Sequence, residues 1–157
     1  MLVVSFFKQV KVRFSDTDPA GVMYFPRFLD RFHGVFEDWF SDELGMPYHW
    51  VLEETGIGFP TVHTECDYRK PCRFGEILDI ELVVTRVGRR SFSCTYKVRG
   101  SGESEIRVQA TLVTATVALD SFEPVPIPPV LRARLAERLE PPVREVPRTG
   151  RTAAAGE

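Results

Sequence analysis

Residues 12–28, VRFSDTDPAGVMYFPRF, pass from a strand-like pattern through a turn to a helix-like pattern, and the rest of the chain is organised around this change. Apolar Val12 and Phe14 alternate with polar residues, as in a strand. A turn-prone run follows, and Pro26 marks the predicted start of an aromatic-rich helix, because proline is tolerated in a first helical turn. Asp18 therefore lies just before a helix start, where unpaired backbone N–H groups favour negative charge. This stretch offers a carboxylate and an oxyanion site close together, although an Asx-turn that only caps the helix is the simpler alternative.

The helix predicted after Pro26 has a bulky apolar face. Its large residues recur at three- and four-residue spacings, which is typical of an amphipathic helix. Gly45 and Pro47 mark its predicted end, and a shorter helix is expected over about residues 50–54. The apolar face consists of Phe28, Phe32, Phe36, Trp39 and Phe40.

From Phe59 onward the apolar period changes to two, which predicts strands. The last two connections are short enough for antiparallel hairpins. Together with a strand in the first ten residues, this gives five strands and one long helix, an α+β chain. The four later strands are predicted over residues 61–68, 77–87, 91–99 and 104–119.

The C-terminal part differs in composition from the rest. Residues 123–129 form a stiff proline-rich linker, and residues 130–140 are predicted to form a charged helix. We therefore divide the chain into a main domain (1–120), a linker with a short helix (121–140) and a tail (141–157) expected to be disordered.

Composition excludes several classes of protein. At 157 residues and 17.9 kDa the chain is one domain by size. A net charge of -2 and a pI near 6.0 argue against nucleic-acid or membrane partners that are held by overall basicity. The three cysteines are odd in number and fit no zinc motif, so we expect reduced thiols and a cytoplasmic location.

The usual catalytic motifs are missing from the sequence. It contains no G-x-S-x-G elbow, no H-E-x-x-H pair and no glycine-rich phosphate loop. A carboxylate site remains, of the kind that activates water or attacks a carbonyl carbon directly. We expect no cofactor and no metal.

The run DTDPAGVMYFP resembles the signature of the hotdog-fold thioesterases, in particular the 4-hydroxybenzoyl-CoA thioesterase-like family. The likeness continues in the same order through GIGFPTVHTECDYRKPCRFGEILDIELVV and GRRSF, and covers roughly residues 8–118. The resemblance implies a five-stranded antiparallel sheet wrapped around one long helix, here with a C-terminal helical extension. It also implies an acyl-CoA substrate and a homodimer or homotetramer, since subunits of this fold commonly join their sheets.

The resemblance assigns roles around the opening stretch. Asp18 matches the catalytic Asp of the family, as nucleophile or as general base. The oxyanion donor would be the backbone N–H of Phe25. The 4-hydroxybenzoyl enzyme has Tyr at this position, but a backbone N–H is present with either side chain. Gly21 would let the turn approach the thioester, although a plain turn glycine fits equally well. Tyr24 completes the expected substrate contacts here, and Asp16 is expected to be structural.

Three further residues are assigned to substrate binding. His33 matches a helix position where the namesake enzyme has an Asp that meets the substrate hydroxyl; the alternative is a packing or surface histidine. Arg89 and Arg90 match paired arginines that hold the nucleotide phosphates, and the alternative is a solvated hairpin tip. A second basic cluster is better explained as surface. It consists of Arg69, Lys70 and Arg73.

The predicted function is hydrolysis of a small, aromatic or hydroxylated aromatic acyl-CoA to the acid and free CoA. A short-chain aliphatic acyl-CoA or acyl-carrier-protein thioesterase is the alternative. The branch that resembles the Tol-Pal thioesterases has a Tyr followed directly by a His, whereas this chain has Phe25 followed by Pro26 at those positions. A non-catalytic acyl-CoA-binding hotdog domain is less favoured because Asp18 is intact, and a hotdog hydratase would need a different His and carboxylate motif.

Overall fold

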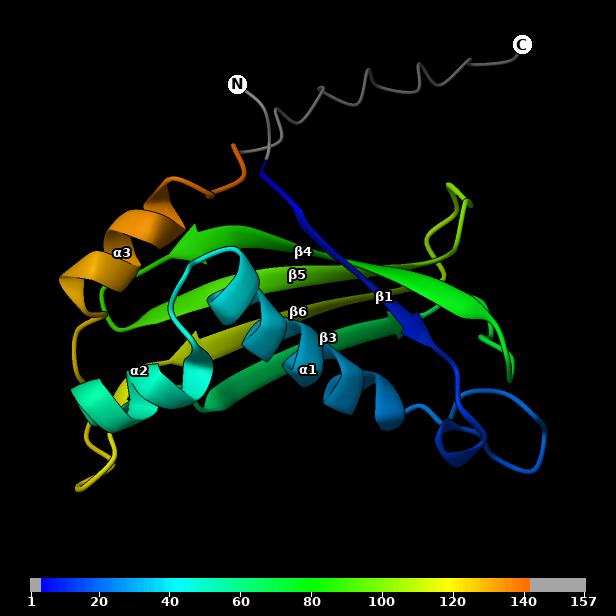
Figure 1. Ribbon diagram of the computed structural model, residues 1–157, viewed down its shortest axis with the longest axis horizontal. Helices are drawn as coiled ribbons and strands as arrows, with labels where there is room; N and C mark the ends of the chain where they lie inside the picture. Colours follow the sequence, from blue (N-terminus) through cyan, green and yellow to red (C-terminus); the bar gives the residue numbers. More distant parts are fainter. Residues whose placement is uncertain (1–3, 142–157) are drawn as a thin grey trace, which may run out of the picture.

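The structure is a computed structural model that describes residues 4–141. Apart from Pro141, the tail predicted over 141–157 lies outside the described residues. One long helix, α1 (Arg27–Asp42), lies across one face of an antiparallel sheet (Figure 1). The strand order is β1-β4-β5-β6-β3, which confirms the expected α+β architecture. The bounds are β1 Phe6–Lys11, β3 Thr61–Tyr68, β4 Ile77–Val87, β5 Ser91–Gly100 and β6 Val108–Ala115.

The aromatic face of α1 forms the centre of the core. Phe32 and Phe40 are fully buried, and Phe32 stacks on Tyr96 of β5 with ring centroids 4.8 Å apart. Phe36 stacks on Phe92 of the same strand at 6.2 Å. Rings of this size bury much apolar surface per residue, so a single helix can cover the width of the sheet.

Two strand predictions were wrong, and in each case a buried side chain or hydrogen bond interrupts the ladder. The strand expected through Phe14 stops at Lys11, because residues 14–16 form a 3₁₀ turn, η1 (Phe14–Asp16), in which Asp16 Oδ2 accepts the N–H of Arg13. The strand expected over 104–119 is shorter at both ends. It begins after the buried Arg107 and ends before Thr116, whose N–H donates to Arg90 O.

Smaller elements close the end of the sheet near the C-terminus of α1. Helix α2 (Tyr48–Thr55) ends at Gly56, which adopts the left-handed conformation with φ +62°. A two-stranded sheet then pairs β2 (Ile57–Gly58) with β7 (Val117–Ala118). Gly58 is packed so tightly that an added Cβ would lie 2.7 Å from the side chain of Leu119.

The predicted C-terminal helix is present and packs onto the main core. Helix α3 (Pro129–Ala136) is shorter than the predicted 130–140 and buries Leu131 and Leu135. The chain then returns to the sheet, where Glu140 N–H donates to Val84 O at 2.8 Å. The extension thus shares the core of residues 1–120.

A buried arginine joins two loops at the opposite end of the sheet. Arg107 is 4% exposed, and its guanidinium lies 2.8 Å from Glu76 Oε2 and 2.8 Å from Glu103 Oε1. Hydrogen bonding to Arg107 lowers the pKa of both carboxyl groups from their ordinary values. The pairing ties the segment after β3 to the β5–β6 turn.

These pKa shifts predict a dependence of stability on pH. The pKa of Glu76 and Glu103 is lowered in the folded state, so both groups stabilise the fold fully at pH values above about 4.3, the pKa of a glutamate in the unfolded chain. Their contribution to the free energy of unfolding is lost as the pH falls through the folded-state pKa. We expect Arg107→Met to lower the free energy of unfolding at pH 7 by about 2 kcal/mol, and to flatten its decline below about pH 4.3. Urea titrations from pH 3 to pH 7 measure this. Arg134→Met is the control, since no carboxylate pairs with Arg134 within residues 4–141; identical pH slopes in wild type and Arg107→Met would refute the pairing.

Candidate active site

Asp18 lies in the loop that joins η1 to α1, and this loop is closed by its own hydrogen bonds. The N–H of Asp18 donates to Val22 O at 3.0 Å, and the N–H of Gly21 donates to Asp18 O at 2.9 Å. Ala20 N–H donates to Asp18 Oδ1 at 2.8 Å. The second carboxylate oxygen has no hydrogen-bond partner within the described residues. The half-buried carboxylate is therefore fixed through one oxygen and free at the other.

Gly21 is required by the conformation of this loop. Its φ is +77°, which favours glycine, and an added Cβ would meet no atom within 4 Å. The glycine also lines a hollow of about 450 Å³, which Asp18, Phe14 and Phe74 line as well.

A buried ion pair attaches the loop to the helix. Asp16 is 1% exposed, and Arg31 Nη2 lies 2.7 Å from both of its carboxylate oxygens. The N–H of Tyr24 donates to Asp16 O at 2.8 Å. Asp16 is thus structural, as expected, and it fixes both ends of the loop that contains Asp18 against α1.

Asp18 faces a cavity of about 400 Å³ at the start of α1. Tyr24 and Phe25 line the same cavity, and Phe28 forms its floor on the helix. Tyr68, at the end of the edge strand β3, donates its hydroxyl to Phe25 O at 3.1 Å and closes the opposite side. The rings meet edge to face, with centroids 5.2 Å apart for Tyr24–Phe25 and 6.0 Å apart for Phe25–Tyr68.

Phe25 lines this cavity, and no described group accepts its backbone N–H. The neighbouring groups are occupied: Tyr24 N–H donates to Asp16 O, and Arg27 N–H donates to Tyr24 O. Phe28 N–H donates to Phe25 O, and Pro26 has no N–H. Within residues 4–141 the N–H of Phe25 has no acceptor, so Phe25 and Asp18, which line one cavity, each have a polar group without a partner.

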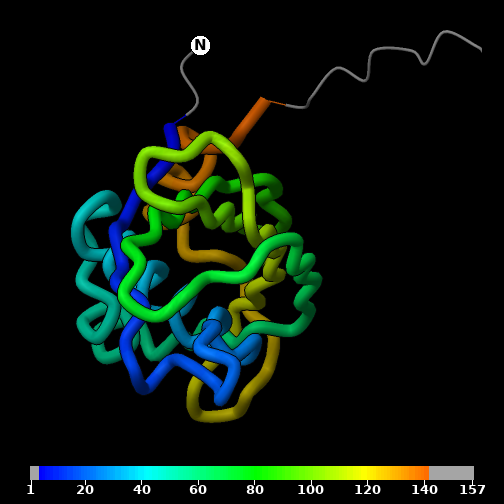
Figure 2. The backbone as a smooth tube through the Cα atoms, turned by 90° about the vertical axis from the view of Figure 1, so that its right-hand side faces the viewer, coloured from blue at the N-terminus to red at the C-terminus, as the bar shows by residue number. Residues whose placement is uncertain are grey.

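Arg69 and Lys70 also line the Asp18 cavity, although the sequence favoured a surface role for them. The segment that contains them runs beside the Asp18 loop: Met23 N–H donates to Cys72 O at 2.7 Å. Figure 2 views this end of the molecule, where the blue loop and the green segment lie side by side. Only this long-range pairing brings the cations to the site, and no local sequence signal encodes it.

Arg89 and Arg90 lie at the other end of the sheet. Near the Asp18 loop, Lys11 pairs with Ile77, the first residue of β4. The eleven residues of β4 are joined by ten steps of about 3.3 Å, which place the β4–β5 turn about 33 Å away, beside α3 (Figure 1). Arg132 of α3 holds this turn by donating to the carbonyls of Gly88 and Arg89, each at 2.8 Å. One chain therefore does not bring these arginines to Asp18.

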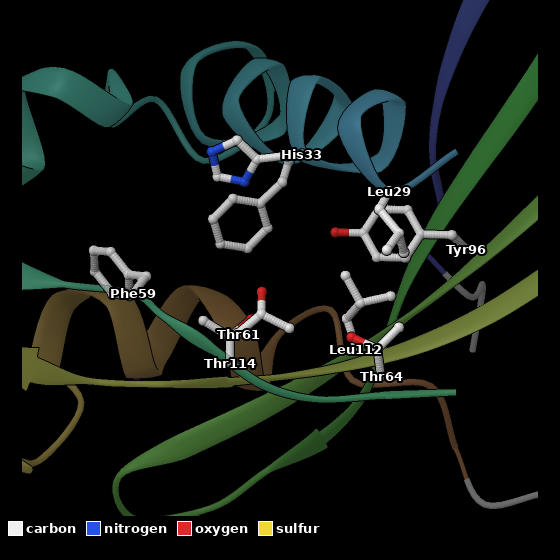
Figure 3. A pocket seen from close by; sticks show the side chains of 9 residues that line it. Leu29, His33, Phe59, Thr61, Thr64, Tyr96, Leu112 and Thr114 are labelled. Carbon is white, nitrogen blue, oxygen red and sulfur yellow. The ribbon is translucent and has the colours of Figure 1, made fainter. Parts of the chain in front are cut away.

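His33 lies two turns along α1, outside the Asp18 cavity. It lines a second cavity of about 370 Å³ between α1 and the strands (Figure 3). Its ring stacks on Phe36 with centroids 6.0 Å apart, and Nε2 lies 3.8 Å from Glu37 Oε1. The histidine is more than half exposed, at the rim of this cavity.

The cysteines are free thiols and do not supply a thiolate nucleophile. Burial raises the pKa of Cys66, Cys72 and Cys94, so all three stay protonated at neutral pH. Within residues 4–141, no group of three or more His, Cys, Asp or Glu side chains is arranged to hold a metal ion. No helix in the same part of the chain is long and apolar enough to cross a membrane.

The fold and the site together define a hotdog-fold thioesterase. Residues 12–135 match the model of the thioesterase-like superfamily, and the chain belongs to this family. It is 27% identical over 124 residues to a 1,4-dihydroxy-2-naphthoyl-CoA hydrolase of Synechocystis sp., covering 79% of this chain and 89% of the relative.

Two solved structures share the fold. The crystal structure of a 1,4-dihydroxy-2-naphthoyl-CoA thioesterase from Synechocystis superposes with a TM-score of 0.78 at 25% identity, covering 85% of this chain and 97% of the other. A 4-hydroxybenzoyl-CoA thioesterase mutant complexed with 4-hydroxybenzoyl-CoA gives 0.75 at 21% identity, covering 83% and 97%. The predicted fold and enzyme class are confirmed.

The Asp16–Arg31 pair should be needed for both stability and turnover. We expect Asp16→Asn to lower the free energy of unfolding by about 2 kcal/mol, because Arg31 loses its charged partner in a buried setting. Turnover should fall more than stability alone explains, since a displaced loop misplaces Asp18. Asp30→Asn is the matched control: its exposed pair with Arg27 at 4.0 Å should contribute less than about 0.5 kcal/mol. Equal stability of the two variants in urea would contradict the anchoring role.

Proposed function

We propose that this protein hydrolyses CoA thioesters of small aromatic acids and that Asp18 is the catalytic carboxylate. The observation that supports this most directly is that Asp18, which has a free carboxylate oxygen, and Phe25, which has a free backbone N–H, line one cavity among the described residues. Nucleophile and oxyanion donor are the two groups that thioester hydrolysis requires.

The proposed reaction uses the groups of the chain and water. The carbonyl oxygen of the thioester accepts the N–H of Phe25, and Asp18 either attacks the carbonyl carbon or removes a proton from the attacking water. In both routes the carbonyl oxygen becomes an oxyanion that the Phe25 N–H stabilises. When the C–S bond breaks, CoA leaves as a thiolate that takes up a proton. In the first route water then hydrolyses the acyl–Asp18 anhydride, so both routes yield acid and free CoA. Neither route uses a metal or another cofactor.

The walls of the cavity support an aromatic acyl group. Tyr24, Phe25, Phe28 and Tyr68 present ring faces and edges to it, a setting in which aromatic rings pack favourably. The names of the relatives agree with this preference, since they refer to naphthoyl-CoA and hydroxybenzoyl-CoA esters.

We further propose that the protein acts as a homodimer or a larger homo-oligomer in which a second chain completes the CoA site. Arg69 and Lys70 supply positive charge within the chain, and arginine forks suit phosphate groups. Arg89 and Arg90 can reach the Asp18 cavity only from another copy, because the length of β4 separates them from it in one chain. The edge strand β3 is exposed along almost its whole length and offers a surface for such pairing.

The catalytic assignment predicts the behaviour of Asp18→Asn. Thiol release from benzoyl-, 4-hydroxybenzoyl-, phenylacetyl- and short aliphatic CoA esters should be fastest for the aromatic esters. It should fall at least about 100-fold in the variant, because the amide is neither a nucleophile nor a base. Asp120→Asn, in a surface turn, is the matched control. Faster release from aliphatic or acyl-carrier-protein esters would favour the alternative thioesterase. Acyl-CoA binding without release would favour a non-catalytic hotdog domain.

The shared site predicts complementation between two defective chains. Asp18→Asn chains retain both arginines, and chains with Arg89→Ala and Arg90→Ala retain Asp18. After co-expression, half of the dimers should contain one chain of each kind, and one of their two sites should be intact. At low acyl-CoA concentration the mixture should therefore reach about a quarter of wild-type activity. Activity equal to the mean of the two parent variants would show that each chain builds its own site.

A further inference from the structure

The proposed oxyanion donor belongs to a residue whose own side chain gives it little support. Phe25 is 60% exposed, whereas Phe28, one turn further along α1, is 3% exposed. An exposed ring is not locked by packing, so the direction of the Phe25 N–H depends on the hydrogen bonds of the two peptide groups that flank its Cα atom. A residue that makes one of these bonds can therefore act on the reaction without touching the substrate.

The peptide group before Phe25 is held locally, and the one after it is held from a distant part of the chain. Tyr24 O accepts the N–H of Arg27 at 2.9 Å, within the first turn of α1. Phe25 O accepts the N–H of Phe28 at 3.3 Å and the hydroxyl of Tyr68, 43 residues further along the chain, at 3.1 Å. In the part of the chain that the structure describes, this is the one hydrogen bond between β3 and residues 17–28.

Tyr68 is itself held by the sheet. It is the last residue of β3, and it pairs with Val108 of β6. Its ring lies against both aromatic residues of the helix start, with ring centroids 6.0 Å apart for Phe25 and 5.6 Å apart for Phe28. Burial raises the pKa of Tyr68 above its ordinary value, so the hydroxyl stays protonated at neutral pH and remains a donor. The sheet therefore presents a fixed donor to Phe25 O.

We propose that Tyr68 is a positioning residue, which directs the Phe25 N–H toward the thioester carbonyl by holding the C=O group of the same residue. This inference rests on the proposed function and adds to it a residue of the edge strand. The N–H and C=O groups of Phe25 share one Cα atom, so a bond that holds the C=O group limits the rotation of the N–H. An oxyanion donor works only when it points at the position that the oxyanion occupies. Tyr68 therefore acts on the transition state through Phe25 and takes no part in the bond changes.

Tyr68→Phe tests this role because it removes the hydroxyl and keeps the ring. With 4-hydroxybenzoyl-CoA we expect kcat to fall about tenfold, since a misdirected donor loses part of the roughly 100-fold effect of an oxyanion donor. The Kd of the ester, measured in the Asp18→Asn background, should stay within about twofold, because the donor acts mainly in the transition state. Tyr48→Phe is the matched control: this phenol packs on Phe36 and Phe40, so kcat should equal that of wild type. A weaker Kd with an unchanged kcat would mean that the Tyr68 hydroxyl binds the substrate directly, and would overturn the positioning role.

A spectroscopic arm separates this inference from the proposed catalysis. The same ester, isotope-labelled at the thioester carbonyl, is bound to Asp18→Asn with and without Tyr68→Phe, and the infrared band of its carbonyl is recorded. The band should lie below that of the free ester, because accepting the Phe25 N–H weakens the C=O bond, and Tyr68→Phe should remove part of this shift. That result supports the inference even if Asp18 proves not to be catalytic.

An unchanged band overturns the inference whatever happens to kcat, and so does failure of the labelled ester to bind. Urea titration of Tyr68→Phe is the structural control: a residue that only stabilises the fold lowers the urea midpoint and leaves the band in place. Loss of activity in Asp18→Asn, together with a normal kcat and an unchanged band in Tyr68→Phe, would reject the role of Tyr68 and leave the proposed function standing.

Discussion

The packing of α1 against the sheet is the constraint on which the rest of the structure depends. The helix buries Phe32, Phe36 and Phe40, and Phe32 and Phe36 stack on Tyr96 and Phe92 of β5. One cavity lies at the start of α1 and another lies between α1 and the strands, so both border the helix that these rings position.

The start of α1 forms the candidate active site. The Asp16–Arg31 pair fixes the loop on the helix, and the loop then fixes Asp18 through one oxygen. Phe25 precedes the helix: its carbonyl accepts the N–H of Phe28, and its own N–H has no acceptor within residues 4–141. The described structure therefore has Asp18, with a free carboxylate oxygen, and Phe25, with a free backbone donor, in the lining of one cavity.

The sequence predicted those features that depend on neighbouring residues. The turn around Asp18, the aromatic helix, the hairpins and the C-terminal helix follow from local periodicity and turn chemistry, and the family resemblance supplied the arrangement of the sheet. Features that depend on contacts between residues far apart in the sequence were not predicted. The cations Arg69 and Lys70 join the site only because their segment pairs with the Asp18 loop, and Arg107 shortens β6 by pairing with Glu76. The same limit applies to Tyr96, since strand periodicity gives its burial but not the cavity at its hydroxyl.

The most direct test of the central claim is a crystal structure of the Asp18→Asn variant with 4-hydroxybenzoyl-CoA bound. We predict that the thioester carbonyl oxygen lies about 2.7–3.2 Å from the backbone nitrogen of Phe25, with the substituted side chain in contact with the carbonyl carbon or with a water molecule beside it. A thioester bound with its carbonyl away from both groups would contradict the account.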